Sequence, residues 1–208
     1  MNKPVVYGAD YSVYVRIVRL VLEEKGIDYE LVPVDIFAAD GIPAWYFEHH
    51  PFGRIPAFEH DGFRLHETGA IARYVDEAFA GPALQPAEAS ARARMNQITG
   101  MLGAYAYRAM VWDVAVERLE KEAPDEALIA AGLGQAATVL RVLTSLKAAG
   151  PWLLGEQLTL ADLHAASIIG YFLKVAEGQK LLAEFPDIRR WWDGIVQRPS
   201  FARTEKVG

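Results

Sequence analysis

The spacing of apolar residues changes once along this chain of 208 residues. Up to about residue 80, short apolar runs suited to strands alternate with amphipathic helical segments. The run Val5–Tyr7 predicts a first strand. Val15, Val18 and Leu22 then recur at the spacing of one helix face. Beyond residue 87 the pattern is helical, so a small mixed sheet with helices packed on it should precede an all-helical region.

Residues that cap, turn and stop regular elements mark boundaries in the first region. Ser12 is placed to cap the first helix, and Gly26 is placed to end it. A second strand is expected over 29–34 and an irregular loop over 37–50. Asp61-Gly62 is a strong hairpin signal and predicts antiparallel strands on either side of the turn.

A stretch rich in glycine and proline, GPALQP over 81–86, separates the two regions. It predicts a first domain over 1–80, a linker over 81–87 and a helical domain over 88–208. In the helical domain we expect long helices over 87–122 and 125–149, a helix that begins at a capping box of Thr159 and Asp162, and a last helix over 186–198.

Composition excludes several classes of function. The formal net charge of -6 argues against a nucleic-acid partner, because phosphate binding needs a basic face. No uncharged apolar run reaches roughly 18 residues, so we expect no membrane span. The chain has 0 cysteines, which excludes disulfides, thiolate metal sites and a cysteine nucleophile, and we expect no metal. The start of the chain shows no export signal, so the cytoplasm is the expected compartment.

The segment HPFGRIPAFEHDGFRLHETGA, over residues 50–70, is the most informative part of the chain. Pro56 lacks the N–H that a strand ladder needs, so it must lie at a strand start or edge, with a cis bond as one way to turn backbone groups outward. Glu67 and Thr68 place a carboxylate and a hydroxyl at the mouth of a helix. These groups and the main chain near Pro56 suit a small peptide-like ligand.

Five segments in this order resemble the glutathione S-transferase family. They are YGADYSVYVRIVRLVLEEKG, HPFGRIPAFEHDG, the pair Glu67-Thr68 where the family usually has Glu-Ser, LTLADLHAA and FPDIRRWWDGIVQRPSF. The resemblance covers nearly the whole chain and is greatest to bacterial-type members of serine-type classes such as phi and theta. It implies an α+β thioredoxin-like N-terminal domain that binds glutathione, joined to an all-α C-terminal domain.

This resemblance makes Ser12 the catalytic residue, which would stabilise the glutathione thiolate. A cysteine-like thiol has a pKa of about 8.5, and ionising most of it at neutral pH needs roughly 2.7 kcal/mol. One hydrogen bond to a charged group contributes about 1.5–3 kcal/mol and a helix N-terminus about 0.3–1 kcal/mol, so one hydroxyl suffices. Tyr7, Tyr11 and Tyr14 remain alternative donors.

The resemblance also implies how glutathione is held. The main chain of Ile55 would pair with the cysteinyl part as an added strand, at an edge that Pro56 shapes. Glu67 would face the ammonium of the γ-glutamyl end and Thr68 its carboxylate. Arg54 stands where many relatives have Gln or Lys, and it is suited to a carboxylate.

One part of the family pattern is missing. Serine-type relatives often carry a His-Lys pair for the glycyl carboxylate, and this chain has Gly41 and Ile42 at those positions. Trp45, His49 and His50 lie nearby in the sequence, but a loop histidine is usually solvated, so we assign the glycyl carboxylate to no residue.

By resemblance, the second substrate lies between the domains, against the first long helix of the helical domain. Tyr105, Arg108 and Trp112 share one face of that helix with Met101, and with Tyr11 they form the expected pocket for a small hydrophobic electrophile. Peroxides are a second substrate class. Phe52 occupies a position that holds a subunit-locking aromatic residue in some classes, although it also suits the core, and a homodimer is expected.

Two other functions compete with this one. The same fold serves as a non-catalytic binding or assembly module in subunits of the translation elongation factor gamma type. Specialised glutathione-dependent dehalogenases and etherases also share it. The sequence favours the transferase because Ser12, Pro56, Glu67 and Thr68 are all present, whereas a binding module has no need of them.

Overall fold

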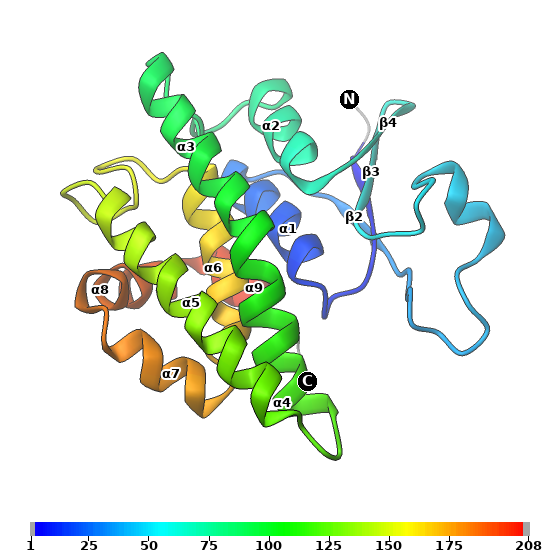
Figure 1. Ribbon diagram of the computed structural model, residues 1–208. Coiled ribbons are helices and arrows are strands. Elements are labelled where there is room, and N and C mark those ends of the chain that lie inside the picture. The colour runs from blue at the N-terminus through cyan, green and yellow to red at the C-terminus, as the bar shows by residue number, and fades with distance from the viewer. Residues whose placement is uncertain (1–2, 206–208) are drawn as a thin grey trace. The chain divides into compact units, whose positions relative to one another are not determined.

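The computed structural model describes residues 3–205 (Figure 1). Its contacts divide the chain into two compact units, one containing residues 3–83 and 199–205 and the other residues 84–198. This division places the segment after residue 198 with the first unit, whereas the predicted helical domain over 88–208 includes it. The predicted domain limits otherwise stay a prediction.

The first unit is built on a four-stranded sheet with the strand order β2-β1-β3-β4. Strand β1 (Val5–Tyr7) pairs in parallel with β2 (Glu30–Val32) and antiparallel with β3 (Ala57–His60). Strand β4 (Phe63–His66) pairs antiparallel with β3. The predicted mixed sheet is therefore confirmed, although β2 is shorter than the expected 29–34.

Helix α1 (Val13–Lys25) connects the two parallel strands, and helix α2 (Thr68–Ala78) follows β4. The predicted stripe of Val15, Val18 and Leu22 is fully buried. Ser12 caps α1, and Gly26 ends it in the left-handed conformation, with φ at 68°. Both of these predictions are confirmed.

The predicted hairpin is also confirmed. Asp61 and Gly62 have φ values of 50° and 81°, as a two-residue turn between right-twisted strands requires. Glycine adopts this conformation without the steric cost that a side chain adds. Pro56 lies just before β3, and the Ile55–Pro56 peptide bond is cis. The proline is therefore at the strand start, where its missing N–H breaks no ladder bond.

The loop between β2 and β3 extends from the sheet (Figure 1). It was expected to be irregular, but it contains a 3-10 helix, η1 (Ala44–Glu48), anchored by the fully buried Tyr46. The Tyr46 hydroxyl donates to the main-chain oxygen of Arg54 at 2.6 Å. Gly53 follows with φ at 58°, and a Cβ atom there would lie 2.9 Å from Ile42 Cδ1. Close contact therefore fixes the loop ahead of β3.

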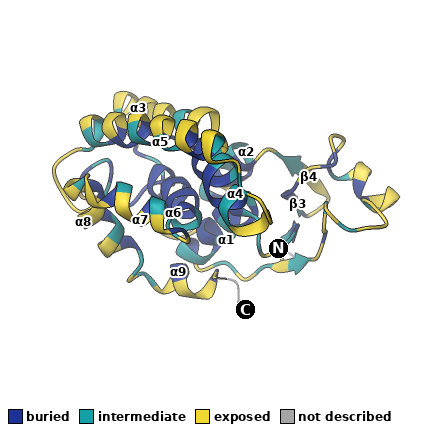
Figure 2. Cartoon of the chain, turned by 60° about the horizontal axis from the view of Figure 1, so that its bottom comes forward, coloured by how far each residue is buried: buried dark blue, intermediate teal, exposed yellow. Residues whose placement is uncertain are grey.

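The second unit is helical. Its elements are α3 (Ala89–Met101), η2 (Leu102–Val116), α4 (Glu117–Glu120), α5 (Glu126–Leu146), α6 (Leu160–Phe172), α7 (Ala176–Ala183) and α8 (Pro186–Ile195). The helix predicted over 87–122 is a succession of three of these, because its centre, η2, is π-helical. Helix α5 packs along η2, and α6 is buried along nearly its whole length among the other helices (Figure 2).

The predicted capping box at the start of α6 is confirmed, and it reaches further than the sequence indicates. The carboxylate of Asp162, which is fully buried, accepts hydrogen bonds from the N–H and the hydroxyl of Thr159 at 2.8 and 2.9 Å. It also accepts from Leu153 N–H at 2.8 Å and from Trp191 Nε1 at 2.9 Å. Burial raises the pKa of Asp162, and these four bonds act in the opposite direction.

A short last helix, α9 (Pro199–Arg203), was not anticipated. Within the first unit it packs against α1: the guanidinium of Arg16 lies 4.1 Å from the centre of the Phe201 ring and donates to the Phe201 main-chain oxygen at 3.0 Å. The predicted helix over 186–198 ends earlier, at Ile195.

Helix α5 is long and apolar enough, by length and composition, to cross a membrane. Its apolar window is 33% buried, and a single helix of this kind also occurs in the cores of soluble proteins. The helix contains Arg141, so its apolar window is not the long uncharged run that the sequence analysis looked for.

Candidate functional site

Three segments that the sequence analysis identified lie together at one end of the strands of the sheet. Strands β1 and β4 run in the same direction, because each is antiparallel to β3. The register pairs Tyr7 with Ala57, and Ala57 with His66. The segments that leave β1, enter β3 and leave β4 therefore meet at this end of the sheet. They carry the start of α1, the cis-proline segment and the start of α2.

Gly8 shows how closely the first two of these segments approach each other. A Cβ atom at Gly8 would lie 2.4 Å from Val15 Cγ2 and 3.3 Å from Ile55 Cβ. The φ of Gly8 is 156°, and the missing side chain lets the first turn of α1 pack near Ile55. The N-terminal turn of α1 and the cis-proline segment thus form one compact site.

Ser12 occupies the N-cap of α1, with φ at -74° and ψ at 126°. Its side-chain oxygen accepts a hydrogen bond from Val15 N–H at 3.3 Å. This bond uses a lone pair, so the hydroxyl proton is left to donate. The first turn of the helix contains no acidic residue, so no carboxylate within that turn weakens the attraction of the helix dipole for an anion.

Two of the tyrosines considered as alternative donors, unlike Ser12, pack among aromatic rings or already donate a hydrogen bond. The Tyr7 ring centre lies 4.2 Å from that of His49 and 6.1 Å from that of Trp45. Burial, followed by the charge of Glu59, raises the pKa of Tyr7. The Tyr11 hydroxyl donates to Asp35 Oδ1 at 2.7 Å, and burial together with that bond raises the pKa of Tyr11. The Tyr11 donor is thus engaged, while Tyr14 stays an alternative.

Glu67 and Thr68 form the start of α2. Glu67 has φ at 71° and ψ at 110°, a conformation that costs a residue with a side chain about 1–3 kcal/mol and often occurs at functional sites. Its main-chain oxygen accepts from Ala70 N–H and Ile71 N–H, while the exposed carboxylate makes no capping bond to the described residues. Thr68 is 8% exposed. A free carboxylate therefore stands beside unpaired helix N–H groups.

The cis-proline segment presents main chain and one cation. Arg54 is exposed, while Ile55 and Pro56 are buried. Within residues 3–205, no group forms a hydrogen bond with the main-chain N–H or oxygen of Ile55. An unpaired peptide group beside the first residue of a strand can accept an extended peptide as an added strand.

Two family models match this chain: the glutathione S-transferase N-terminal domain over residues 6–83 and the glutathione S-transferase C-terminal domain over residues 98–199. The chain belongs to the glutathione S-transferase family. Glutathione S-transferase F13 of Arabidopsis thaliana is 30% identical over 204 residues, covering 95% of this chain and 93% of the relative. The predicted family and activity class, a glutathione transferase, are confirmed.

Solved structures of glutathione S-transferases match the whole fold. The apo form of glutathione S-transferase III has a TM-score of 0.84 at 34% identity and covers 98% of this chain and 95% of its own. A glutathione S-transferase from Methylobacillus flagellatus, solved with GSH bound, has a TM-score of 0.82 at 26% identity, covering 99% and 100%. The predicted thioredoxin-like plus all-helical fold is confirmed, and glutathione is the substrate of this family.

In this transferase the residues expected to hold the electrophile lie on different units. Tyr11 belongs to the first unit, and Tyr105, Arg108 and Trp112 lie on η2 in the second. Tyr105 is 57% exposed, and Arg108 Nε donates to Asp113 Oδ1 at 2.6 Å. Both residues lie off the buried stripe of η2, so they are available at the surface, and their role stays a prediction.

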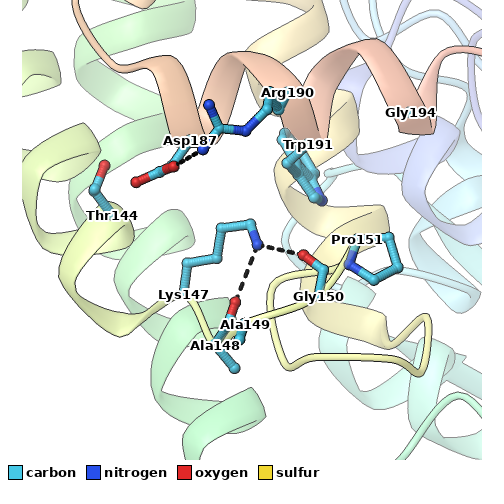
Figure 3. Close-up of a pocket in the computed structure, with 10 residues that line it drawn as sticks. All are labelled: Thr144, Lys147, Ala148, Ala149, Gly150, Pro151, Asp187, Arg190, Trp191 and Gly194. Carbon is cyan, nitrogen blue, oxygen red and sulfur yellow. Dashed lines mark hydrogen bonds and ion pairs between the residues drawn. The ribbon is translucent and has the colours of Figure 1, made fainter.

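A cavity of about 520 Å³ in the second unit does not coincide with any predicted site (Figure 3). It lies between the end of α5 and helix α8. Lys147 Nζ donates to the main-chain oxygens of Ala148 and Gly150 at 3.0 and 2.7 Å, and Arg190 pairs with Asp187. Its cations are thus engaged within the protein, and none of the residues predicted to bind glutathione lines it.

The sequence analysis weighed His50 only for the glycyl carboxylate, and it did not predict that His50 pairs with His66 close to the start of α2. The ring centres of His50 and His66 are 4.9 Å apart, and His66 immediately precedes Glu67. The two residues are far apart in sequence, so no spacing motif reveals the pair. Among the described residues, no group of three or more histidine or acidic side chains is arranged to hold a metal ion.

Proposed function

We propose that this chain transfers glutathione to small apolar electrophiles and that Ser12 donates a hydrogen bond to the glutathione thiolate. The observation that supports it is the N-cap geometry of Ser12, whose lone pair is engaged by Val15 N–H and whose proton is left to donate. A hydrogen bond to a charged group contributes about 1.5–3 kcal/mol and the helix N-terminus about 0.3–1 kcal/mol. Together they lower the thiol pKa by roughly two units.

The reaction needs little else from the protein. The thiol proton passes to water, and the sulfur remains anionic beside Ser12. Its electron pair attacks an electrophilic carbon, forming a carbon–sulfur bond while the leaving group departs with the pair that bound it. With a peroxide, the sulfur bonds to one oxygen while the O–O bond breaks and the other oxygen leaves as an alcohol or water. The thiol of a second glutathione then displaces the bound hydroxyl as water, and glutathione disulfide is released. Holding the two reactants together supplies the remaining acceleration.

Glutathione would lie across the strand ends described above. The peptide groups of Ile55 pair with the cysteinyl residue, and Arg54 donates to a carboxylate of the tripeptide. The exposed carboxylate of Glu67 faces the γ-glutamyl ammonium, and Thr68, with the N–H groups at the start of α2, faces the γ-glutamyl carboxylate. Pro56 sets the direction in which the chain enters β3.

Replacing Glu67 with glutamine should weaken glutathione binding about tenfold, because the ammonium loses its charged partner. Binding is measured by calorimetry and by retention on immobilised glutathione. Glu77→Gln, at the exposed far end of the same helix, is the matched control and should bind like the unaltered protein. Equal loss in both variants, or no loss at Glu67, contradicts this placement of glutathione.

The proposed acceptor is apolar or aromatic. Tyr105 and Trp112 offer ring surface for it, and Arg108 favours acceptors that carry negative charge. A reduced glutathione pool is characteristic of the cytosol, which supports a cytoplasmic location.

We also propose that the protein is a homodimer. Phe52 has 73% of its surface exposed, which is unusual for a large aromatic residue and suits insertion into a partner subunit. Light scattering should return the mass of two chains, and Phe52→Ser should shift the equilibrium toward one. A single-chain mass for the unaltered protein at micromolar concentration contradicts the dimer.

A further inference from the structure

His50 is buried beside the proposed glutathione site, and its ring nitrogen Nδ1 has no partner. The residue is 4% exposed, and no described residue forms a hydrogen bond with Nδ1. Its ring packs against those of His66, Phe52 and Tyr46, with centres 4.9, 6.2 and 6.5 Å away. Most buried polar groups find partners, so an unpartnered ring nitrogen beside a proposed binding site calls for an explanation. A neutral ring tolerates this apolar packing, whereas a protonated ring does not.

The main chain of His50 organises the turn that leads to the cis-proline segment. Its N–H donates to Tyr46 O at 3.0 Å, and its oxygen accepts from Gly53 N–H at 2.9 Å. The same Tyr46 holds Arg54 O through its hydroxyl. On the other side of the ring, His66 continues directly into Glu67. The His50 ring therefore lies between the two segments that are proposed to grip the tripeptide.

The charged and titratable groups around this ring disfavour a proton on it. His66 comes from β4, Arg54 from the turn before β3 and Glu67 from the start of α2, while Tyr46 of η1 remains neutral. Burial is the largest influence, and repulsion from His66 follows, so the pKa of His50 lies below the ordinary value of 6.5. Glu67 and the main chain of His50 itself act in the opposite direction and do not reverse the shift.

We propose that His50 is a positioning residue whose uncharged ring keeps the cis-proline turn and the start of α2 in the geometry that binds glutathione, and whose protonation releases them. The inference rests on the proposed function, since glutathione must bind at Ile55 and Glu67. Because a loosened turn protonates more readily than the closed one, acid favours the open state. Binding is fully present above about pH 6.5 and is lost as the pH falls below that value.

The test is calorimetry of S-methylglutathione binding between about pH 5 and 7. Glutathione itself is unsuitable, because the proposed stabilisation of its thiolate makes its own binding depend on pH. The thioether has no thiol, and its carboxyl and amino groups do not titrate appreciably in this range. The dissociation constant of the unaltered protein should rise about five- to tenfold toward the acid end. His50→Asn, which cannot be protonated, should change less than about twofold over the same range. The matched control is His49→Gln: this neighbouring histidine packs on Tyr7 rather than on His66, and its variant should keep the original slope.

A flat profile in the unaltered protein, an unchanged slope in His50→Asn, or loss of the slope in His49→Gln overturns the inference and leaves the proposed function intact. Absence of glutathione binding at neutral pH rejects the proposed function and the inference with it. Circular dichroism checks folding. If His50→Asn does not fold, His66→Asn takes its place; removing the repelling neighbour should reduce the fold-change by about half, and an unchanged fold-change overturns the inference.

Discussion

Replacing Ser12 with glycine should lower turnover with chloro-dinitrobenzene about 10- to 25-fold at neutral pH while glutathione still binds. The hydroxyl is the donor that stabilises the sulfur anion. Without it, the thiol returns toward its ordinary pKa of about 8.5, and only a few per cent is ionised near pH 7. The pH–rate profile should show this directly, because the acid limb of the variant moves up by about two pH units.

Glycine is the informative substitution because Ser12 has two roles. The same oxygen caps α1 through Val15 N–H, and alanine at an N-cap costs about 1 kcal/mol whereas glycine costs only a few tenths. Glycine therefore removes the donor and leaves the helix nearly as stable. Ser12→Thr retains both a hydroxyl and a cap, and it should retain most of the turnover.

Variants of the three tyrosines considered as alternative donors provide the result that would contradict the role of Ser12. Tyr7→Phe and Tyr11→Phe should each keep more than about half of the activity, since one phenol packs among aromatic rings and the other already donates to Asp35. Tyr14→Phe completes the set. Full activity in Ser12→Gly, together with loss in one of the tyrosine variants, moves the role to that tyrosine.

Replacing Asp162 with alanine should lower the free energy of unfolding by more than about 3 kcal/mol. The substitution leaves three N–H groups and one hydroxyl, all previously bonded to the carboxylate, without a partner in the core. Each unsatisfied buried donor costs about 1–3 kcal/mol, so the combined loss exceeds that of an ordinary helix cap, which is about 1 kcal/mol. Urea unfolding followed by tryptophan fluorescence measures the change.

Two further variants isolate the cause. Asp162→Asn keeps one acceptor oxygen but turns an NH₂ group toward donors, so it should recover only part of the loss. Asp193→Ala removes a carboxylate from the surface pair with Arg189 on α8, where the change should stay within about 0.5 kcal/mol. Equal losses at Asp162 and Asp193 contradict the view that buried donors cause the effect.

Local sequence signals were sufficient wherever the physics is local. A cap, a stop and a two-residue turn each depend on residues within a few positions, and Ser12, Gly26 and Asp61-Gly62 behave as predicted. Features that depend on contacts between residues distant in sequence differ from the prediction, because tertiary packing decides them. The 37–50 loop contains η1 because Tyr46 fills the core and bonds to Arg54, a contact that no spacing announces.

The order of apolar runs, helix caps and turn residues was enough to deduce a mixed sheet followed by helices, because those preferences act over one or two turns of chain. It also indicated a candidate donor at the start of α1 and a carboxylate at the start of α2. Folding supplied what no local rule contains. It buried His50 against His66 and gathered four donors on Asp162, because side chains distant in sequence acquire neighbours, and changed charge preferences, only when the core closes around them.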